Sequence, residues 1–584
     1  LHVRSRRQRQ MCIRDRYQSP RPTGHPHPQG VSLRDGNGRR PRHHVRRSRH
    51  AGYPVTHLSH LSRTSWLRGL AALAAGAATG TGFQPLDWWI LVIPGLAALI
   101  LLVRPTTGRA AAGLGYLFGL GLFATTIAWV GVMGHPVAVL LTAVMALWCL
   151  LAGWAIRCVS VLPGAPLFQA MVWTATEVGA AAVPLGGFGW VRLAWAVVDT
   201  PWVGALRWAG TTGTSLLVAL AAALLARVVA ARGKRRVHNA VGLMAELVVV
   251  AVLATVSGTI ATRVTHHDDS VRVLVVQGGV DGTAGPYAMG YARSVTDNHL
   301  SQTIMAVAEQ RVSGKGAHDM ILWPENSTDI DPVLDVKSHQ IVMGALAISK
   351  RPILVGAVTD GPGDDERQTT SMWWPASSPK PTSIYHKRNL VPFGEWIPAR
   401  SFFLPLIPIL ENIGRQSVPG TTPGVLDSTI SGTKVPIGVV VCFEVAYDDT
   451  VADTVRHGAR ILAVQSNNSS FIDTAQTPQQ WQITRARAVE TGRHIIVSTT
   501  NSFSGLVNPD GSVCLRTEEG AHTNFTVRVP LESGLTLAVR MGMWLRVVVV
   551  LVAAGAAVVS VIRRRRDMLA QANNRSERNV RHRH

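Results

Sequence analysis

Long apolar stretches run from residue 66 to residue 262, and few charged side chains interrupt them. A helix needs roughly 20 mostly apolar residues to cross the hydrocarbon core of a bilayer. By that criterion the pattern predicts seven membrane spans in this region and an eighth near the C-terminus. The predicted spans are residues 67–84, 88–104, 111–132, 136–158, 165–183, 212–231, 239–261 and 542–562.

From Val271 onward, short apolar runs alternate with polar segments of helical character. Short runs of β-branched and aliphatic residues indicate strands, and their alternation with helices indicates a layered α/β domain. The predicted strands are 271–276, 319–323, 352–356, 382–386, 435–441, 461–464 and 494–498, and the predicted helices are 292–312, 331–349, 447–457 and 478–492.

Two basic tails flank these regions. The N-terminal tail carries fifteen arginines and almost no apolar periodicity, so we expect it to be disordered. Because it begins with Leu1, we expect part of it not to be native, and we exclude it from the prediction of the fold. The predicted segments are the N-terminal tail (1–64), the membrane domain with seven spans (65–264), the α/β domain (268–532), the eighth span (540–562) and the C-terminal tail (563–584).

The net charge of +23 at pH 7 would suggest a nucleic-acid partner if it covered a soluble fold. Here the basic clusters instead flank the predicted spans, where positive charge favours the cytoplasmic side. With eight spans and a cytoplasmic N-terminus, the clusters 104–109, 157–163, 227–238 and 563–566 all fall on that side. We therefore expect a multi-pass protein of the cytoplasmic membrane with both termini in the cytoplasm. The domain 268–532 is then on the outer face, and no nucleic-acid partner is expected.

The chain has five cysteines and no CxxC pair. Their spacing predicts no metal site, and no diffusible cofactor is implied. The pair Cys442 and Cys514 falls in the predicted α/β domain, and a disulfide between them would abolish any chemistry at Cys442. The cysteines are Cys12, Cys149, Cys158, Cys442 and Cys514.

Three residues with reactive side chains, Glu325, Lys387 and Cys442, directly follow predicted strands. Open α/β sheets bind their ligands at strand ends. A carboxylate that removes the thiol proton, a thiol nucleophile and an ammonium that stabilises an oxyanion form a workable set for acyl transfer. The alternative for Cys442 is a core position, since free Cys is among the most buried residue types. Glu177, inside the fifth predicted span, is a further candidate because intramembrane carboxylates are usually functional. The alternative is that Glu177, near the outer end of the span, reaches the lipid headgroups.

Three motifs, in this order along the chain, resemble the nitrilase superfamily: Leu322-Trp-Pro-Glu325, Tyr385-His-Lys-Arg-Asn-Leu-Val-Pro-Phe-Gly-Glu-Trp-Ile-Pro398 and Cys442-Phe-Glu444. Together with the predicted spans, residues 66–565 resemble the apolipoprotein N-acyltransferase family, the membrane-embedded branch of that superfamily. The resemblance implies an α-β-β-α sandwich on the outer face, joined to a polytopic helical membrane domain of about eight spans.

The resemblance also implies a function and roles for individual residues. Cys442 would attack a phospholipid acyl donor and form a thioester, with Glu325 as general base and Lys387 stabilising the oxyanion. The acyl chain would then pass to the α-amino group of a diacylglyceryl apolipoprotein acceptor, the last step of lipoprotein maturation. Supporting or substrate-binding roles would belong to Glu395, Glu444, Phe443 and Trp190.

The chain departs from the family's pattern at three places. Phe443 stands where Tyr is common, the segment Asn467-Asn-Ser-Ser-Phe471 lacks a Trp, and Gly187-Phe-Gly-Trp190 has Gly where Pro is usual. These changes leave the reactive residues in place but affect the expected substrate entry and lipid preference.

Two other functions fit parts of the sequence. A membrane-tethered nitrilase-type amidase or hydrolase would use water as the acyl acceptor, but it would not need eight spans. A transporter or scaffold with an inactive soluble domain would not need the set Glu325, Lys387 and Cys442. We therefore expect an N-acyltransferase.

Overall fold

The computed structural model describes residues 63–264, 269–282, 290–314 and 317–581. The predicted tail 1–64 lies outside these residues except for its last two positions, and so does Cys12.

A helix occupies each position at which the apolar pattern predicts a span. Within the described residues, four helices are long and apolar enough to cross a membrane by length and composition, at 135–159, 203–230, 234–260 and 537–571. The helices at the predicted spans are α1 (Arg63–Gly80), α2 (Val92–Val103), α3 (Gly108–Thr126), α4 (His135–Val159), α5 (Ala165–Ala180), α6 (Val203–Ala230), α7 (Lys234–Val264) and α13 (Leu537–Arg581).

Two of these helices have boundaries that differ from the prediction. Helix α6 starts ahead of the predicted span 212–231, and it is interrupted at Gly210, whose φ of 62° and ψ of −168° are not helical. The predicted span therefore corresponds to the part of α6 after this break. Helix α13 continues past the predicted end at residue 562, because residues 563–581 contain no Gly or Pro to end it.

The first sheet of the α/β domain has seven strands. They are β1 (Ser270–Gln277), β2 (Met320–Leu322), β3 (Ile353–Asp360), β4 (Glu366–Trp374), β5 (Ser383–His386), β6 (Gln416–Ser417) and β15 (Thr523–Pro530). The strand order is β15-β1-β2-β3-β4-β5, with β6 paired to β4. Strands β1, β2 and β3 are parallel, and β5 has the same direction because it is antiparallel to β4, which is antiparallel to β3.

The second sheet has six strands. They are β7 (Val425–Leu426), β10 (Ile437–Val441), β11 (Ile461–Ser466), β12 (Ile495–Thr499), β13 (Gly505–Val507) and β14 (Val513–Arg516). The order is β14-β13-β12-β11-β10-β7, and the central strands β10, β11 and β12 are parallel. A separate small hairpin consists of β8 (Thr429–Ile430) and β9 (Thr433–Lys434).

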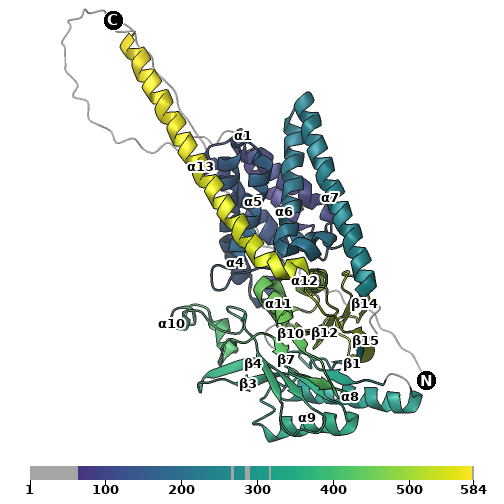
Figure 1. Ribbon diagram of the computed structural model, residues 1–584. Coiled ribbons are helices and arrows are strands. Elements are labelled where there is room, and N and C mark those ends of the chain that lie inside the picture. The colour runs from purple at the N-terminus through teal and green to yellow at the C-terminus, as the bar shows by residue number, and fades with distance from the viewer. Residues whose placement is uncertain (1–62, 265–268, 283–289, 315–316, 582–584) are drawn as a thin grey trace, which may run out of the picture. The chain divides into compact units, whose positions relative to one another are not determined.

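Helices complete the domain. The α-helices are α8 (Ser294–Ser313), α9 (Val336–Ser349), α10 (Arg400–Phe403), α11 (Asp448–Arg456) and α12 (Gln476–Thr491). The 3-10 helices of the chain are η1 (Trp89–Leu91), η2 (Ala128–Met133), η3 (Leu193–Val197), η4 (Pro408–Ile413), η5 (Cys442–Ala446) and η6 (Ser469–Phe471). Figure 1 shows α8 and α9 on one side of the strands and α11 and α12 on the side of the membrane helices.

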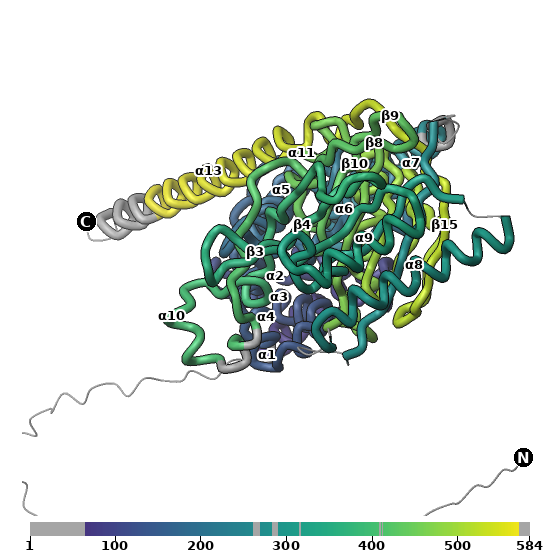
Figure 2. Tube along the Cα trace, turned by 90° about the horizontal axis from the view of Figure 1, so that it is seen from below, coloured from purple at the N-terminus to yellow at the C-terminus, as the bar shows by residue number. Residues whose placement is uncertain are grey.

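Three apolar cores separate these layers, so the predicted α-β-β-α sandwich is present. Between the sheets, Leu354 of β3 packs in one cluster with Val439 of β10. On the outer face of the first sheet, Ile321 packs in one cluster with Val342 of α9, and Figure 2 views the domain from this side. The outer face of the second sheet belongs to a core that continues into the membrane helices.

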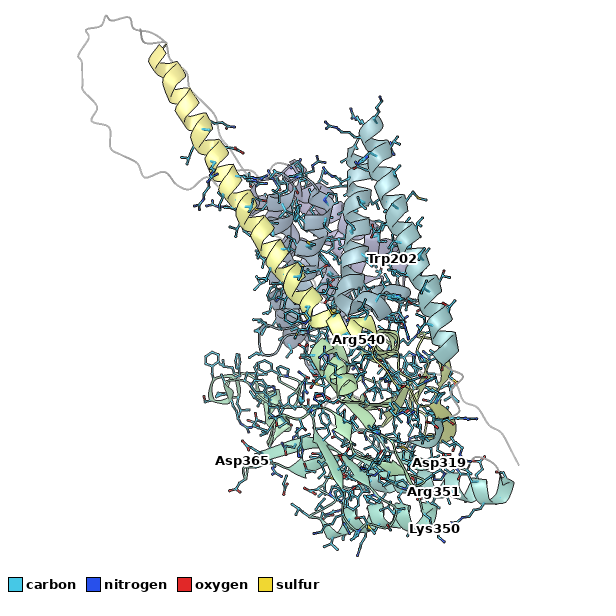
Figure 3. All side chains as sticks on the ribbon, in the orientation of Figure 1. Trp202, Asp319, Lys350, Arg351, Asp365 and Arg540 are labelled. Carbon is cyan, nitrogen blue, oxygen red and sulfur yellow. The ribbon has the colours of Figure 1, made fainter. Side chains whose placement is uncertain are left out.

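The parallel strands place their carboxyl ends at one edge of each sheet. Asp319 and Arg351 precede β2 and β3, and Figure 3 labels them at the right of the domain, across the sheet from Asp365, which follows β3. The residues that follow β2, β5, β10 and β11 lie at the other end. Trp202 before α6 and Arg540 on α13 lie at the junction with the membrane helices (Figure 3).

Candidate active site

Strand β10 ends in a tight elbow that carries Cys442. The φ angle of Cys442 is +51°, a conformation that costs a non-glycine residue about 1–3 kcal/mol. Val441 and Phe443 are buried, whereas the Cys442 side chain is only half-buried. The backbone therefore turns the thiol out of the strand core.

Glu325 and Lys387 form an ion pair next to this thiol. Lys387 Nζ lies 2.9 Å from Glu325 Oε1, and the two side chains are 2% and 4% exposed, respectively. The second carboxylate oxygen of Glu325 accepts a hydrogen bond of 2.7 Å from the backbone N–H of Asn467, just after β11. Besides burial, the negative charge of Glu325 also acts on the neighbouring Cys442 thiol and raises its pKa. The structure thus brings together all three residues of the predicted set.

Glu395 supplies a second carboxylate to Lys387, with Oε2 at 3.0 Å from Nζ. Its oxygens also accept hydrogen bonds from the Thr369 hydroxyl at 3.1 Å and the Val391 backbone N–H at 2.9 Å. These contacts fix the loop after β5 beside the ammonium. An ammonium has three N–H donors, and two of those on Lys387 point to carboxylates.

Burial and charge shift the pKa values of these groups in different directions. Burial raises the pKa of Glu325, the Lys387 ammonium opposes this shift, and the negative charge of Glu395 adds to it. Burial by itself lowers the pKa of Lys387, but Glu325 and Glu395 outweigh it and hold that pKa well above its usual value. Burial and the Glu325 charge raise the pKa of the Cys442 thiol, and Lys387 lowers it. The resting site therefore holds a protonated thiol, a charged lysine and a carboxylate that can accept a proton.

Glu444 joins the elbow to the loop that carries Lys387. It is fully buried, and its Oε2 accepts a hydrogen bond of 2.8 Å from the Val441 backbone N–H. Its Oε1 accepts from the Tyr385 hydroxyl at 2.8 Å and from the backbone N–H groups of Arg388 and Asn389 at 2.7 and 3.1 Å. Four donors therefore hold this carboxylate in one position, and it fixes Cys442 relative to Lys387.

Gly356 of β3 allows the segment of Glu325 to approach this strand closely. A Cβ atom at Gly356 would lie 2.2 Å from the Pro324 carbonyl oxygen and 2.7 Å from the Glu325 Cα. Both distances are shorter than any tolerated contact, so only glycine fits here. The backbone position of the carboxylate depends on this approach.

Comparison with known proteins identifies the family. Residues 75–224 match the model of the apolipoprotein N-acyltransferase N-terminal domain, and residues 347–534 match the carbon-nitrogen hydrolase model. Apolipoprotein N-acyltransferase from Mycolicibacterium smegmatis is 32% identical over 501 residues, which cover 82% of each chain. This chain belongs to the apolipoprotein N-acyltransferase family.

A second relative agrees with this assignment, and one solved structure aligns only weakly. Apolipoprotein N-acyltransferase from Pseudomonas aeruginosa is 27% identical over 509 residues, which cover 83% of this chain and 94% of that relative. Among solved structures, a nitrilase-superfamily amidase from Nesterenkonia AN1 aligns with 45% of this chain and 90% of its own, with 15% identity and a TM-score of 0.32. The chain is therefore an acyltransferase of the carbon-nitrogen hydrolase superfamily.

In this N-acyltransferase, Phe443 packs in an aromatic cluster. Its ring stacks on Trp190 at a centroid distance of 5.7 Å and on Phe188 at 5.9 Å, and it meets Tyr447 edge-on at 5.3 Å. Phe188 and Trp190 belong to the segment between α5 and α6. The phenyl ring beside Cys442 thus joins the elbow after β10 to that segment.

Gln479 on α12 joins the α/β domain to the N-terminal helical part, and the sequence does not reveal this role. Its Oε1 accepts hydrogen bonds from the indole N–H groups of Trp129 and Trp190 at 3.0 and 2.8 Å. Its Nε2 donates to the carbonyl oxygens of Gln84 and Thr126 at 2.8 and 2.9 Å. All four hydrogen-bonding positions of the carboxamide are used, each by a residue from the N-terminal helical part.

A second junction consists of buried charges. Arg192 makes two hydrogen bonds to Asp448, of 2.9 and 2.8 Å, and Arg487 makes a third of 2.7 Å. Arg487 also donates to the carbonyl oxygen of Val445 in the elbow at 2.7 Å. Glu177 lies 3.9 Å from Arg192, so this candidate takes part in the junction and not in the reacting set.

The structure answers whether the two cysteines of the α/β domain are linked. Cys442 and Cys514 are both free thiols, so the disulfide considered from the sequence is absent between them.

Glu246 on α7 is a second carboxylate inside a predicted span, and the sequence analysis missed it. It is 7% exposed, and neither of its carboxylate oxygens has a hydrogen-bond partner among the described residues.

Proposed function

We propose that this acyltransferase moves an acyl chain from a phospholipid to the free α-amino group of the diacylglyceryl-cysteine at an apolipoprotein N-terminus, through a thioester on Cys442. The observation that carries the proposal is the buried pair of Glu325 and Lys387 at the strained elbow of Cys442. Membership of the apolipoprotein N-acyltransferase family supplies the class of substrate.

In the first half-reaction, Glu325 takes the proton of the Cys442 thiol, and the sulfur attacks the ester carbonyl carbon of the phospholipid. The S–C bond forms, and the third N–H of Lys387 donates to the resulting oxyanion. The ester C–O bond then breaks, and the proton on Glu325 passes to the leaving oxygen. Lysophospholipid departs and the acyl group stays on sulfur.

In the second half-reaction, the neutral α-amino group of the lipoprotein attacks the thioester carbonyl carbon. Glu325 takes one amine proton, and Lys387 again stabilises the oxyanion. The N–C bond forms, the C–S bond breaks, and the proton passes from Glu325 to the Cys442 sulfur. The free thiol is regenerated, so the reaction is of the ping-pong type and needs no cofactor.

The other predicted residues support this chemistry. Glu395 fixes Lys387 and adds a negative charge that keeps Glu325 basic, and Glu444 holds the elbow and the Lys387 loop together. Phe443 and Trp190 form part of the aromatic wall beside the thiol, where an acyl chain enters from the side of the membrane helices. Their ring contacts support this role.

We also infer the arrangement in the membrane. The helices α1 to α7 and α13 are eight spans, with residues 65–264 as membrane domain, 268–532 as catalytic domain and 540–562 as the part of α13 within the bilayer. The termini are cytoplasmic, and the catalytic domain lies on the outer face of the cell membrane. Both lipid-anchored substrates then reach Cys442 from the outer leaflet, which is supported by the basic clusters at one set of helix ends.

The test is the mass of a reporter lipoprotein that is co-expressed with this enzyme in cells that lack their own N-acyltransferase. The expected product is an N-terminal peptide heavier by one acyl chain, absent with the Cys442→Ser variant. A reporter that remains diacylated with the wild-type enzyme would overturn the proposal.

A further inference from the structure

We propose that Gln480 binds the α-amino group of the acyl acceptor through its side-chain oxygen. The inference rests on the function proposed above and adds a residue that selects the attacking group in the second half-reaction.

Gln480 lies on the first turns of α12, next to the junction residue Gln479, and it is 5% exposed. Its Oε1 is 4.0 Å from the Cys442 sulfur. The charge of the Glu325 carboxylate also acts on this thiol. The sulfur therefore has a neutral acceptor on Gln480 within hydrogen-bonding distance and a charged carboxylate, Glu325, in its electrostatic surroundings.

A network of buried polar side chains fixes which end of the Gln480 carboxamide faces the sulfur. Its Oε1 accepts hydrogen bonds of 2.8 Å from Asn468 Nδ2 and from Gln476 Nε2. Its Nε2 donates to the Ser466 hydroxyl at 2.6 Å. If the oxygen and nitrogen of this carboxamide were exchanged, its N–H₂ group would face the donor groups of Asn468 and Gln476. The oxygen therefore stays on the side of the thiol. The position of this acceptor is set before any substrate arrives.

The two acceptors match the two N–H bonds of a primary amine. During attack on the thioester, the amine uses its lone pair to form the N–C bond. One proton leaves to Glu325 and later to the sulfur, and the other remains on nitrogen as the N–H of the new amide. Once the thiol is acylated it no longer donates to Gln480 Oε1, and the retained N–H takes that place. An alcohol has no second proton to offer.

Gln480 Oε1 accepts the amine N–H in addition to the hydrogen bonds that it already accepts from Asn468 and Gln476. The contribution of the bond to the amine is therefore that of an ordinary neutral hydrogen bond, and its loss should slow transfer about tenfold. Acylation of the enzyme, which involves no amine, should not need it.

The experiment separates the two half-reactions in the full-length enzyme. Acylation is measured as lysophospholipid release with phospholipid alone, and transfer as loss of the pre-formed acyl-enzyme on addition of a diacylglyceryl peptide with a free N-terminus. Gln480→Met removes the acceptor but keeps an unbranched side chain of similar size. Gln480→Glu keeps an oxygen but places a negative charge beside the sulfur. Gln476→Met is the matched control, because it removes a carboxamide of the same network that does not face the thiol.

We expect Gln480→Met to acylate within about twofold of the wild type and to transfer about tenfold more slowly. Gln480→Glu should show the reverse, with slow acylation and near-normal transfer, because the added charge disfavours the thiolate. Gln476→Met should change both steps by similar, small factors. Normal transfer by Gln480→Met, or an equal loss in both half-reactions, would overturn the inference. A wild-type enzyme that forms no acyl-enzyme would instead overturn the proposed function and this inference with it.

Discussion

Lys387 and Glu325 form an ion pair of 2.9 Å in which both side chains are almost completely buried. Removing one partner of such a pair leaves an uncompensated buried charge, at a cost of about 3–5 kcal/mol. We therefore expect Lys387→Met to lose this much of its free energy of unfolding, together with all acyl transfer. The double variant Glu325→Gln/Lys387→Met should regain part of the stability and none of the activity. Denaturant unfolding in detergent and an N-acylation assay measure the two effects. A double variant that is less stable than the single one would contradict the pairing.

The acidic limb of the pH profile tests the proposed role of Glu325 as general base. A general base works only when deprotonated, and burial, opposed by Lys387, raises the pKa of Glu325 with a further contribution from the Glu395 charge. Activity should therefore fall, as the pH decreases, at a pH above the ordinary pKa of a glutamate. Glu395→Gln removes a neighbouring negative charge, so its acidic limb should move to lower pH. The profile of kcat/KM for acylation measures the shift. A limb that stays in place or moves upward would contradict the assignment of the base.

The four hydrogen bonds of Glu444 together should stabilise the protein more than any one of them does alone. Glu444→Gln turns an amide N–H₂ group toward donors, and each buried donor left without a partner costs about 1–3 kcal/mol. We expect a loss of more than about 2 kcal/mol in unfolding free energy, and a lower kcat because the elbow and the Lys387 loop lose their common anchor. Tyr385→Phe removes one of the four donors and is the control, with an expected loss of about 1 kcal/mol. Equal losses of unfolding free energy and kcat in the two variants would argue against a joint role of the four hydrogen bonds.

Gln479 tests the junction between the helical part and the catalytic domain. Gln479→Glu keeps the shape and still accepts from Trp129 and Trp190, but its second oxygen faces the carbonyl oxygens of Gln84 and Thr126. Two lost bonds and this repulsion should lower the thermal midpoint and slow acylation. Trp129→Phe, which removes one bond only, should be milder. Thermal unfolding that is unchanged in Gln479→Glu would show that the four contacts do not stabilise the junction.

Two of the three candidate reacting residues could be proposed from the sequence because they follow strands with a strong apolar pattern. Cys442 follows five buried residues of β10, and Glu325 follows the fully buried β2. The α-β-β-α layers could be anticipated as well, through the family resemblance. By contrast, β15 was missed, although Phe525, Val527 and Val529 alternate with polar residues as in a half-buried strand.

The junction residues could not be predicted, because their partners are distant in the chain. Gln479 is one of several glutamines at the start of α12, and its contacts lie 289 to 395 residues away. The break of α6 depends on Gly210, which in the sequence is one glycine among many in apolar segments. Glu246 was overlooked within an otherwise apolar stretch. Phe443 looked like the loss of a hydroxyl, whereas its ring stacks on Phe188 and Trp190.

The most direct test of the thioester mechanism is the intact mass of the purified enzyme after incubation with phospholipid in the absence of a lipoprotein acceptor. We predict an adduct with the mass of one acyl chain, located on the peptide that contains Cys442, removed by hydroxylamine and absent in Cys442→Ala. An active enzyme whose Cys442 stays unmodified, or an adduct that persists in Cys442→Ala, would contradict the mechanism.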